Sequence, residues 1–460
     1  MKILLSTAPF HPYQGYNFKF PRFPILNLTL LAATLKDRHE IRIAVNAAHR
    51  DKRNYLFDMA ADFKPDVIGF ALPSTVSAMT LGKTIERLKA VSPDSVITCG
   101  GPFATFESAF CLGLGADVVF LGEAEASFPS WIDGGAQTTF AEDTPKGMAF
   151  RSDEDAGLRG EQTITQNLDS LPIPAWDLLD YQPAIYLGAK AAAVEMSRGC
   201  PFNCRFCAVH EFGKSYRAKS AARMLEELKE IKAMGFSELL FVDNSFALDE
   251  RETHQLAEGM LTENWDFEFG AYLRADTICD HSTLMKKLAR AGLRYAIVGF
   301  ESYSDQSLKA VNKSLKHDTN IKAAQVLREC EIFSIGSHIY GSPGELIGNM
   351  VKTYRFGVRS SDLYKAGIYT PLPGSSLHAE LTSKGLLQAG DPLAMDFLHY
   401  RVGDGANRWK VQALSLLLFL TYYLSPVRLL RLMSKSRWTK RIFRVEYQTI
   451  ILRIRAMLTG

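Results

Sequence analysis

Three cysteines within one short stretch are the residues of this chain best suited to chemistry. They stand in Cys200-Pro-Phe-Asn-Cys204-Arg-Phe-Cys207, directly after the apolar run 191–196. Cysteine thiolates are the usual ligands of iron–sulfur clusters. Three thiolates from one loop would hold three irons of a four-iron cluster and leave the fourth open to another ligand. The spacing therefore predicts a [4Fe–4S] site that binds a substrate and passes it an electron.

The C-x3-C-x2-C spacing resembles that of the radical SAM enzymes. The resemblance implies that Cys200, Cys204 and Cys207 hold the cluster and that its open iron chelates S-adenosylmethionine. It also implies that one electron from the cluster breaks the sulfonium bond and produces a 5′-deoxyadenosyl radical. A zinc site is the alternative, because His210 follows and Cys3His sets occur in structural zinc sites. Zinc hairpins usually close with two separated ligand pairs, so four candidates in one loop favour the cluster.

Length and composition indicate a globular protein of several domains. The chain has 460 residues, of which 47% are hydrophobic and 22% charged, too many residues for one ordinary core. The net charge of +3 gives no argument for a nucleic-acid partner. The chain start, Met1–Ser6, predicts a short strand and not a signal peptide. The remaining cysteines are scattered and predict packed thiols in a reducing cytoplasm, namely Cys99, Cys111, Cys279 and Cys330.

Residues 1–135 alternate short β-rich runs with helical stretches, which predicts an α/β domain built on a doubly wound parallel sheet. Ligands of such sheets bind on the loops at the carboxyl ends of the strands. The expected strands are 3–6, 41–45, 67–71, 96–99 and 118–121. The expected helices are 26–36, 77–90, 106–114 and 125–132.

Three of these loops carry small or polar residues that suit a bulky ligand. Glycine lets backbone approach a ligand closely, and hydroxyl groups bond its polar edges. In this order the loops resemble those of the cobalamin-binding domain that precedes the barrel in B12-dependent radical SAM enzymes. The resemblance implies a cobalamin site at Ser74, Thr75, Gly100, Gly101, Gly122 and Glu123.

The chain departs from that family pattern in three places. Phe103 stands where the family often has His, and Ala124 stands where it often has Gly. An Asp-x-His-x-x-Gly motif is missing, and the nearest residues are Asn46-Ala-Ala-His49. We therefore expect cobalamin without a protein His below the cobalt, and a relic domain that no longer holds the cofactor is the alternative.

Residues 136–190 are expected to form a linker, with a polar, patternless surface connection over 136–170 and an extended segment at Leu171–Asp177. From 191 to 385 the alternation returns and resembles the partial (βα)6 barrel of radical SAM enzymes, with its active site at the carboxyl ends of the strands. The expected strands are 192–196, 238–242, 268–273, 295–299, 334–340 and 365–370. The expected helices are 221–233, 251–262, 281–291, 305–311, 321–330 and 346–359.

Polar or aromatic residues near successive strand ends match those that the family uses for S-adenosylmethionine. The resemblance implies that Asp243 and Asn244 contact its amino group and that Arg274 contacts its carboxylate or ribose. Glu301 would bond the ribose hydroxyls, and both Gly341 and Phe206 would lie near adenine. Tyr216-Arg217 resembles a family segment that we interpret as a structural clamp on the cysteine loop.

Residues 386–460 are expected to be a helical, basic region outside the barrel. The apolar run Ala413–Leu424 is too short to span a bilayer. After Pro426 the chain has nine Lys or Arg residues and only Glu446 as an acid. One helical side carries Phe443, Tyr447, Ile450, Ile451, Ile454 and Leu458. This pattern predicts either an amphipathic anchor on a membrane surface or a helix packed on the barrel.

The combined hypothesis is a cytoplasmic enzyme that the tail would hold at the inner face of the membrane. The family resemblance implies cobalamin-dependent modification, chiefly methylation, of an unactivated carbon in an apolar or lipid-like small molecule. It also implies a low-potential electron donor of the flavodoxin or ferredoxin type. Cyclisation or oxidation without methyl transfer is an alternative, as is a degenerate cofactor-binding protein. No basic RNA-binding module is visible in the sequence, which disfavours an RNA methylthiotransferase and any nucleic-acid partner.

Overall fold

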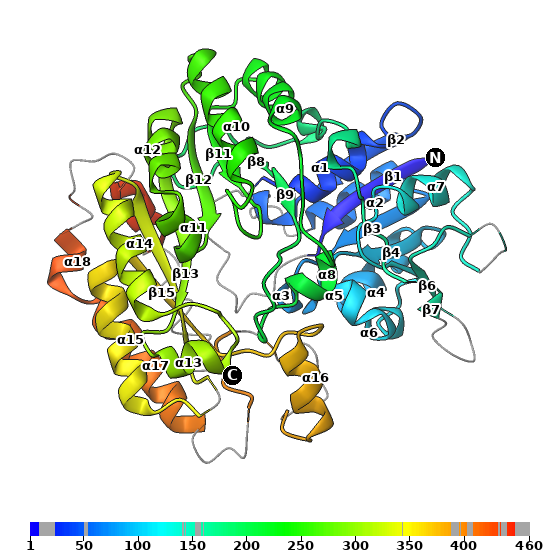
Figure 1. The fold of residues 1–460 in the computed structure, drawn as a ribbon. Coiled ribbons are helices and arrows are strands. Elements are labelled where there is room, and N and C mark those ends of the chain that lie inside the picture. The colour runs from blue at the N-terminus through cyan, green and yellow to red at the C-terminus, as the bar shows by residue number, and fades with distance from the viewer. Residues whose placement is uncertain are drawn as a thin grey trace. The chain divides into compact units, whose positions relative to one another are not determined.

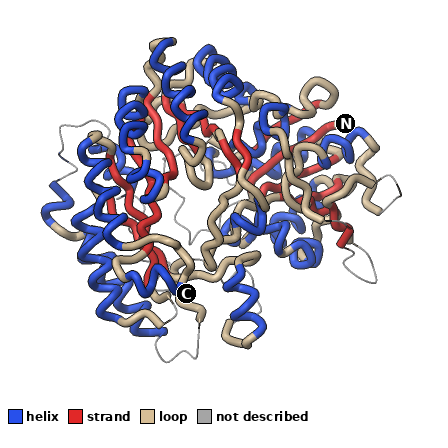
Figure 2. Tube along the Cα trace, in the orientation of Figure 1, coloured by secondary structure: helices blue, strands red, loops and turns tan. Residues whose placement is uncertain are grey.

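The structure is a computed structural model in which the chain divides into two compact units. Unit 1 is built mainly from Met1–Gln182, and unit 2 from Pro183–His210, Ser215–Gly390 and Phe397–Gly460. The residues that it describes are 1–8, 24–49, 54–139, 142, 144–151, 158–159, 161–342, 344–387, 395, 397–402, 408–430, 433 and 439–446. Both units contain a sheet with helices packed on it (Figure 2).

Unit 1 is built on a seven-stranded sheet of order β2-β1-β3-β4-β5-β6-β7 (Figure 1). The first five strands pair in parallel, and the last two are antiparallel additions. The order reverses its direction of growth between β1 and β3, which is the switch point where doubly wound sheets bind ligands. The strands are β1 (Lys2–Thr7), β2 (Glu40–Ala44), β3 (Val67–Ala71), β4 (Val96–Gly100), β5 (Val118–Phe120), β6 (Met148–Phe150) and β7 (Leu158–Arg159).

Apolar side chains from both faces of this sheet are covered by helices, which explains why β3 is buried at every position. The cluster on one face includes residues of α2, α4 and α6, and the cluster on the other includes residues of α1 and α7. The helices are α1 (Leu26–Ala33), α2 (Tyr55–Phe63), α3 (Thr75–Ala78), α4 (Leu81–Val91), α5 (Pro102–Phe106), α6 (Ser108–Gly113) and α7 (Ser127–Asp133). Single 3-10 turns occur at Asn46–Ala48, Leu168–Ser170 and Trp176–Leu178.

Two features of unit 1 differ from the expectation. Helix α2 was not expected, although its apolar residues lie on one face that packs into the core. Part of the segment 136–170, which we expected to be an irregular surface connection, extends the sheet as β6 and β7. All three residues of β6 are buried, because they pair with β5 across the sheet edge.

Unit 2 contains a six-stranded sheet of order β15-β14-β13-β12-β11-β8 in which each ladder is parallel. No ladder joins β15 to β8 among the described residues, so the sheet forms the predicted open, partial barrel. The strands are β8 (Ala191–Val194), β11 (Glu238–Phe241), β12 (Glu268–Leu273), β13 (Leu293–Glu301), β14 (Phe333–Tyr340) and β15 (Leu363–Ile368). A two-stranded ribbon of β9 (Ser197–Arg198) and β10 (Arg217–Ala218) follows the first strand.

The helices of unit 2 begin and end at residues with clear local signals. The side chains of Ser220 and Asp249 accept the N-terminal N–H groups of α9 and α10, and Gly292 ends α12 with a φ of +117°. The helices are α9 (Ala221–Ala233), α10 (Glu250–Thr262), α11 (Ala275–Asp280), α12 (Ser282–Ala291), α13 (Asp305–Ala310), α14 (His317–Glu329), α15 (Ile347–Ser360), α16 (Ser376–Ser383), α17 (Arg408–Tyr423) and α18 (Pro426–Leu430). The short helix α8 (Val209–Gly213) begins in unit 2, and its last three residues belong to unit 1.

The inner face of the barrel sheet is less buried near the carboxyl ends of its strands than elsewhere. Helices cover the outer face of such a sheet, so the alternate residues that remain partly exposed face the barrel interior. They include Tyr272, Ile297, Ser337, Ile339 and Lys365. Tyr272 keeps 39% of its surface exposed. The barrel interior therefore presents the large side chains of Tyr272, Ile297 and Ile339 together with the polar Ser337 and Lys365.

The C-terminal helix that includes residues 439–446 packs into the core of unit 2. Phe443 is fully buried, and its ring meets that of Phe333 at 6.1 Å between centroids. Glu446 accepts a hydrogen bond of 3.0 Å from the Tyr186 hydroxyl and pairs with Lys365 at 2.8 Å. The packed alternative is therefore observed for this part of the tail, and the apolar side that includes Phe443 is not free there. Tyr447, Ile450, Ile451, Ile454 and Leu458 lie outside the described residues.

We predict that the tail is needed for the stability of unit 2. Phe443→Ala should lower the free energy of unfolding by about 3–5 kcal/mol, because it removes a buried aromatic ring and leaves a cavity. Arg444→Ala is the matched control, since Arg444 is exposed and its loss should change stability by only about 0.5 kcal/mol. Urea denaturation of both variants measures the difference. Equal stability of the two variants would show that the tail packing contributes nothing.

Candidate active site

The cysteine loop begins where β8 ends, as predicted, and its base is held by the β9–β10 ribbon. Arg217 pairs with Arg198 in that ribbon, and the Lys219 amide donates a bond of 2.7 Å to the Met196 carbonyl. Gly199, next to Cys200, has a φ of +76°. A Cβ on Gly199 would lie 2.2 Å from the Ser215 carbonyl oxygen, so only glycine fits there.

Two of the three cysteine thiols, those of Cys204 and Cys207, lie in surroundings that oppose their ionisation. Cys204 is buried, Cys200 and Cys207 are half-buried, and the Cys207 amide donates a bond of 3.0 Å to the Cys204 carbonyl. Burial raises the pKa of Cys204, and it raises the pKa of Cys207 to about 11. Metal coordination removes such protons outright, because the metal supplies the missing positive charge. The three thiols therefore fit a positively charged iron centre.

The zinc alternative does not fit this geometry. A single zinc ion needs four donors at about 2.0–2.3 Å. In the part of the chain that the structure describes, no three His, Cys, Asp or Glu side chains converge tightly enough to hold one metal ion. The His210 ring instead lies 3.5 Å from the Cys200 carbonyl oxygen through its Nδ1. A four-iron cluster is larger than one ion, so its thiolates need not converge on a point.

Asp243, at the end of β11, holds the chain that leads into the cysteine loop. Its carboxylate accepts a bond of 2.6 Å from the Ser197 hydroxyl and one of 3.2 Å from the Met196 amide. Burial raises the pKa of Asp243 to about 6, although these two donors oppose the rise. Its visible role is to position the loop, and contact with the methionine amino group remains a prediction. Asn244 is exposed.

Arg274, at the end of β12, supports the cysteine loop from a second side. Its guanidinium lies 3.4 Å from the centroid of the Phe202 ring, which places a cation over an aromatic face inside the loop. Two bonds of 3.0 and 2.8 Å to Asp276 fix its orientation. Arg274 therefore faces the loop that holds the cysteines, while its predicted contact with S-adenosylmethionine stays untested.

The remaining barrel candidates lie at the ends of later strands, with Phe206 in the loop itself. Glu301 ends β13 and pairs with the ammonium of Lys313 at 2.8 Å. The Gly341 amide, after β14, donates a bond of 2.8 Å to the Glu345 carboxylate. Phe206 packs against the cluster that contains Tyr369 and Leu377. The structure thus places all of these candidates at the same end of one sheet.

In unit 1 the candidate ligand loops follow β3, β4 and β5 at the carboxyl edge of the sheet, and the loop after β3 lies beside the switch point between β1 and β3. Thr7 ends β1 and is paired with Ala71 of β3, and Thr75 follows that strand. The hydroxyl oxygens of Thr7 and Thr75 are buried and have no hydrogen-bond partner among the described residues. Buried hydroxyls normally have a partner. A polar ligand at this edge would supply one, so these residues fit a cofactor such as cobalamin.

The motif residues of unit 1 also show structural roles. Ser74 donates its amide to the Ser77 hydroxyl at 3.1 Å at the start of α3. Gly122, with φ +84°, lies so close to the Thr163 carbonyl that a Cβ would be 2.3 Å from it. The Glu123 carboxylate accepts the Thr165 amide at 2.8 Å. These contacts fasten the loops to the neighbouring chain, and the predicted contacts of this set with cobalamin remain a proposal, as do those of Gly100 and Gly101.

The departures from the family pattern have clear positions in unit 1. Phe103 is buried in the core beside Phe110, at 6.3 Å between ring centroids, and so does not face a ligand loop. His49 is stacked on Tyr55 at 4.0 Å and bonds the Asp180 carboxylate at 2.8 Å through Nε2. The imidazole is thus engaged with Asp180 and Tyr55, and the expectation that no His ligates cobalt stays a prediction.

Sequence reasoning missed several residues that hold the cysteine loop. Within the loop, Asn203 and Arg205 form hydrogen bonds with the segment that follows α13. Lys313 of that segment is buried beside Glu301. The Arg205 guanidinium also pairs with Glu380 of α16. The sequence carried no signal for Lys313, since Asn312-Lys313-Ser314 is an ordinary polar stretch between two helices and only the structure shows that its lysine is enclosed.

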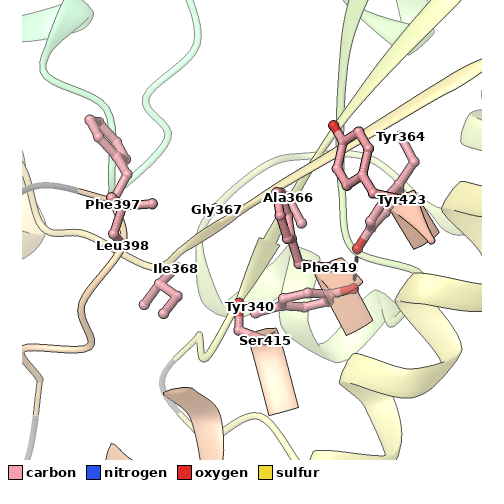
Figure 3. Close-up of a pocket in the computed structure, with 10 residues that line it drawn as sticks. All are labelled: Tyr340, Tyr364, Ala366, Gly367, Ile368, Phe397, Leu398, Ser415, Phe419 and Tyr423. Atoms are coloured by element: carbon pink, nitrogen blue, oxygen red, sulfur yellow. Dashed lines mark hydrogen bonds between the residues drawn. The ribbon is translucent and has the colours of Figure 1, made fainter. Parts of the chain in front are cut away.

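A small pocket on the outer side of the barrel sheet is not a substrate site. Its residues come mainly from β14, β15 and α17 and include Tyr340, Tyr364 and Phe419 (Figure 3). The Tyr340 and Tyr364 hydroxyls bond to each other across it. Its volume of about 20 Å³ has room for one water molecule. A cavity of this size is too small for an organic substrate.

Comparison with known families found one match in each unit. Residues 194–357 match the radical SAM superfamily, and residues 22–131 match the B12 binding domain. These ranges contain the cysteine loop and the loops of the switch point.

Individual proteins are similar to the chain over most of its length. An uncharacterized methyltransferase of Pyrococcus horikoshii is 27% identical and covers 89% of both chains. The anaerobic magnesium-protoporphyrin IX monomethyl ester cyclase of Cereibacter sphaeroides is 25% identical, over 76% of this chain and 58% of that protein. The cobalamin-dependent S-adenosylmethionine radical enzyme OxsB, solved with aqua-cobalamin and S-adenosylmethionine bound, superimposes with a TM-score of 0.75. That alignment covers 98% of this chain and 71% of OxsB at 18% identity, and it supports the fold.

We predict that Gly199 is required for the cysteine loop to hold a cluster. Gly199→Ala should prevent most iron and sulfide incorporation although all three cysteines remain, because the added Cβ meets Ser215 and the backbone strain adds about 1–3 kcal/mol. Gly235→Ala is the matched control, since Gly235 has a similar φ of +79° with open space around it. Iron and sulfide analysis after anaerobic reconstitution measures the outcome. Normal cluster content in Gly199→Ala would disprove the requirement.

Proposed function

We propose that the chain, which matches the radical SAM superfamily and the B12 binding domain, modifies an unactivated carbon of an apolar small molecule, chiefly by methylation. Its cofactors are a [4Fe–4S] cluster, S-adenosylmethionine and cobalamin. When bound, the cluster supplies the electron that splits S-adenosylmethionine, and cobalamin supplies a methyl carrier. The observation that carries the proposal is the cysteine loop at the carboxyl end of the first barrel strand, fixed by Asp243 and Arg274.

The residues of the chain have separable tasks in this proposal. Cys200, Cys204 and Cys207 hold the cluster, and Glu301, Gly341, Phe206 and Asn244 surround the place of S-adenosylmethionine. In unit 1 the hydroxyl groups of Thr7 and Thr75 bond the polar edge of cobalamin, since they are buried without a partner. The remaining cobalamin contacts are Ser74, Gly100, Gly101, Gly122 and Glu123.

An apolar substrate is supported by the inner face of the barrel sheet. Tyr272, Ile297 and Ile339 remain partly exposed there, near the strand ends that carry the other candidates. Exposed large apolar groups on a concave face favour an apolar ligand. The relative from Cereibacter sphaeroides is named for magnesium-protoporphyrin IX monomethyl ester, which is such a molecule. A radical SAM enzyme also needs a reductant, for which we propose a flavodoxin or ferredoxin.

We further propose that unit 2 rests on an anionic membrane surface through α17 and α18. Trp409, Leu417 and Leu424 recur at helical spacing and are 66%, 58% and 66% exposed, and Val427 and Leu430 continue the apolar surface at 66% and 64%. None of the described helices is long and apolar enough to span a bilayer. The chain after Pro426 has nine basic residues and one acid, which complements anionic lipid. Peripheral attachment at the cytoplasmic face follows.

The central prediction is that Cys204→Ala removes the cluster and reductive cleavage of S-adenosylmethionine, because one of three ligands is lost. Cys330→Ala is the matched control, since Cys330 is a half-buried free thiol in unit 2 outside the loop. Iron, sulfide and 5′-deoxyadenosine are measured after anaerobic reconstitution with hydroxocobalamin. Both variants should retain the corrinoid absorbance of unit 1. Retained iron and sulfide in Cys204→Ala would contradict the cluster assignment. A wild-type protein that binds no corrinoid would refute the proposed role of cobalamin.

The membrane proposal predicts loss of lipid binding when charges enter the apolar surface of α17 and α18. The double variant Leu417→Glu, Val427→Glu should bind anionic vesicles about tenfold or more weakly, because two apolar side chains no longer enter the lipid. Leu346→Glu is the matched control, as Leu346 is 68% exposed at the start of α15. Co-sedimentation with phosphatidylserine vesicles at low salt is the measurement. Failure of the wild-type protein to bind, or equal binding by the double variant, would refute attachment.

A further inference from the structure

The end of α13 and the connection from α13 to α14 form hydrogen bonds with the cysteine loop on both sides of Cys204. The Arg205 amide donates to the Val311 carbonyl at 3.0 Å, and the Arg205 guanidinium donates to the Ala310 carbonyl at 3.1 Å. The Asn312 amide nitrogen donates to the Asn203 carbonyl at 2.7 Å. The bonded residues flank Cys204 directly. The position of this cysteine is therefore tied to the segment that carries Lys313.

The backbone around Lys313 is held in an unfavourable conformation. Asn312 and Ser314, which flank it, have φ values of +52° and +54°. Residues other than glycine avoid this left-handed region unless the surrounding structure imposes it. The conformation turns the lysine inward, and its side chain is only 8% exposed. The structure thus accepts backbone strain on both sides of a buried cation.

The place of the Lys313 ammonium is defined by β13. It lies 2.8 Å from the Glu301 carboxylate, and Glu301 itself has a φ of +59°. A Cβ at Gly299 would lie 3.1 Å from the lysine nitrogen and 2.5 Å from the carboxylate oxygen. Only glycine leaves room for the pair there. The ladder with β14 also shifts its register between Gly299 and Glu301. The glycine, the positive φ of Glu301 and the register shift at this strand end therefore all accommodate the ion pair.

A buried ion pair contributes little to stability on its own, because desolvation offsets the attraction. The segment that carries this lysine is bonded to the residues on both sides of Cys204. The Arg274 guanidinium further bonds the Lys313 carbonyl at 3.5 Å. Fixed positive charge near thiolates favours whichever cluster state is more negative.

We propose that Lys313 is a positioning residue that sets the charge beside the cysteine loop and makes the cluster easier to reduce. Its ammonium stabilises the additional negative charge of the reduced cluster, and the electron comes from the one-electron donor of the enzyme. Glu301 holds the ammonium in place and partly offsets its charge. The inference rests on the proposed cluster at Cys200, Cys204 and Cys207.

The test is an anaerobic redox titration of the full-length protein without S-adenosylmethionine, followed by electron paramagnetic resonance of the reduced cluster. At a fixed potential, Lys313→Gln should lower the ratio of reduced to oxidised cluster by about tenfold, which is about 59 mV for a one-electron couple. Glu301→Gln should raise that ratio, because the cation then acts without its partner. The double variant should lie between the two, and Lys313→Arg should restore the ratio found in the wild-type protein.

The opposite signs separate a charge effect from loss of structure. A merely structural pair would give lower cluster content in both single variants and leave the potential of the remaining cluster unchanged. That result would overturn the proposal, as would shifts of the same sign in both. A wild-type protein that forms no cluster would instead overturn the proposed function, so the two failures are distinguishable.

Discussion

Buried thiols give up their protons reluctantly, and the cysteine loop of this chain places Cys204 and Cys207 in such surroundings. They become good ligands only where positive charge replaces the lost water, and the metal is the main source of that charge. A loop with this requirement must be held rigidly, because each ligand has to meet its iron in the right place. The contacts of unit 2 around the loop follow from this constraint.

Four separate parts of the barrel provide that rigidity, three of them close to strand ends and the fourth between the helices α13 and α14. The β9–β10 ribbon fixes the entry to the loop beside Gly199. Asp243, which follows the next barrel strand, accepts bonds from Met196 and Ser197 at the start of that ribbon. Arg274 lies over Phe202, and the segment after α13 bonds the residues on either side of Cys204. Because parallel strands bring their carboxyl ends to one edge, residues distant in sequence can act on one loop.

The sequence allowed the strands and most helices of both sheets to be predicted, because buried parallel strands are short apolar runs bounded by turn residues. Helix α2 was missed although its apolar face is regular, and β6 was missed because three residues carry too little periodicity. The cysteine loop was predictable from spacing alone. Lys313 was not, since nothing in a polar stretch between two helices shows that its backbone turns the lysine inward. The burial of Phe443 depends on long-range packing, which a helical pattern leaves open.

The loops of unit 1 show that a glycine motif does not by itself indicate a ligand contact. Gly101 and Gly122 both have positive φ, and a Cβ on either would meet a carbonyl of the neighbouring chain, that of Leu72 or Thr163. Contacts within the protein are thus sufficient to require glycine at both positions. The hydroxyls of Thr7 and Thr75 differ, because they are buried at the switch point and nothing in the described part of the chain bonds them. An unpaired buried hydroxyl is unfavourable unless a ligand completes it, so these threonines point to the cofactor more directly than the glycines do.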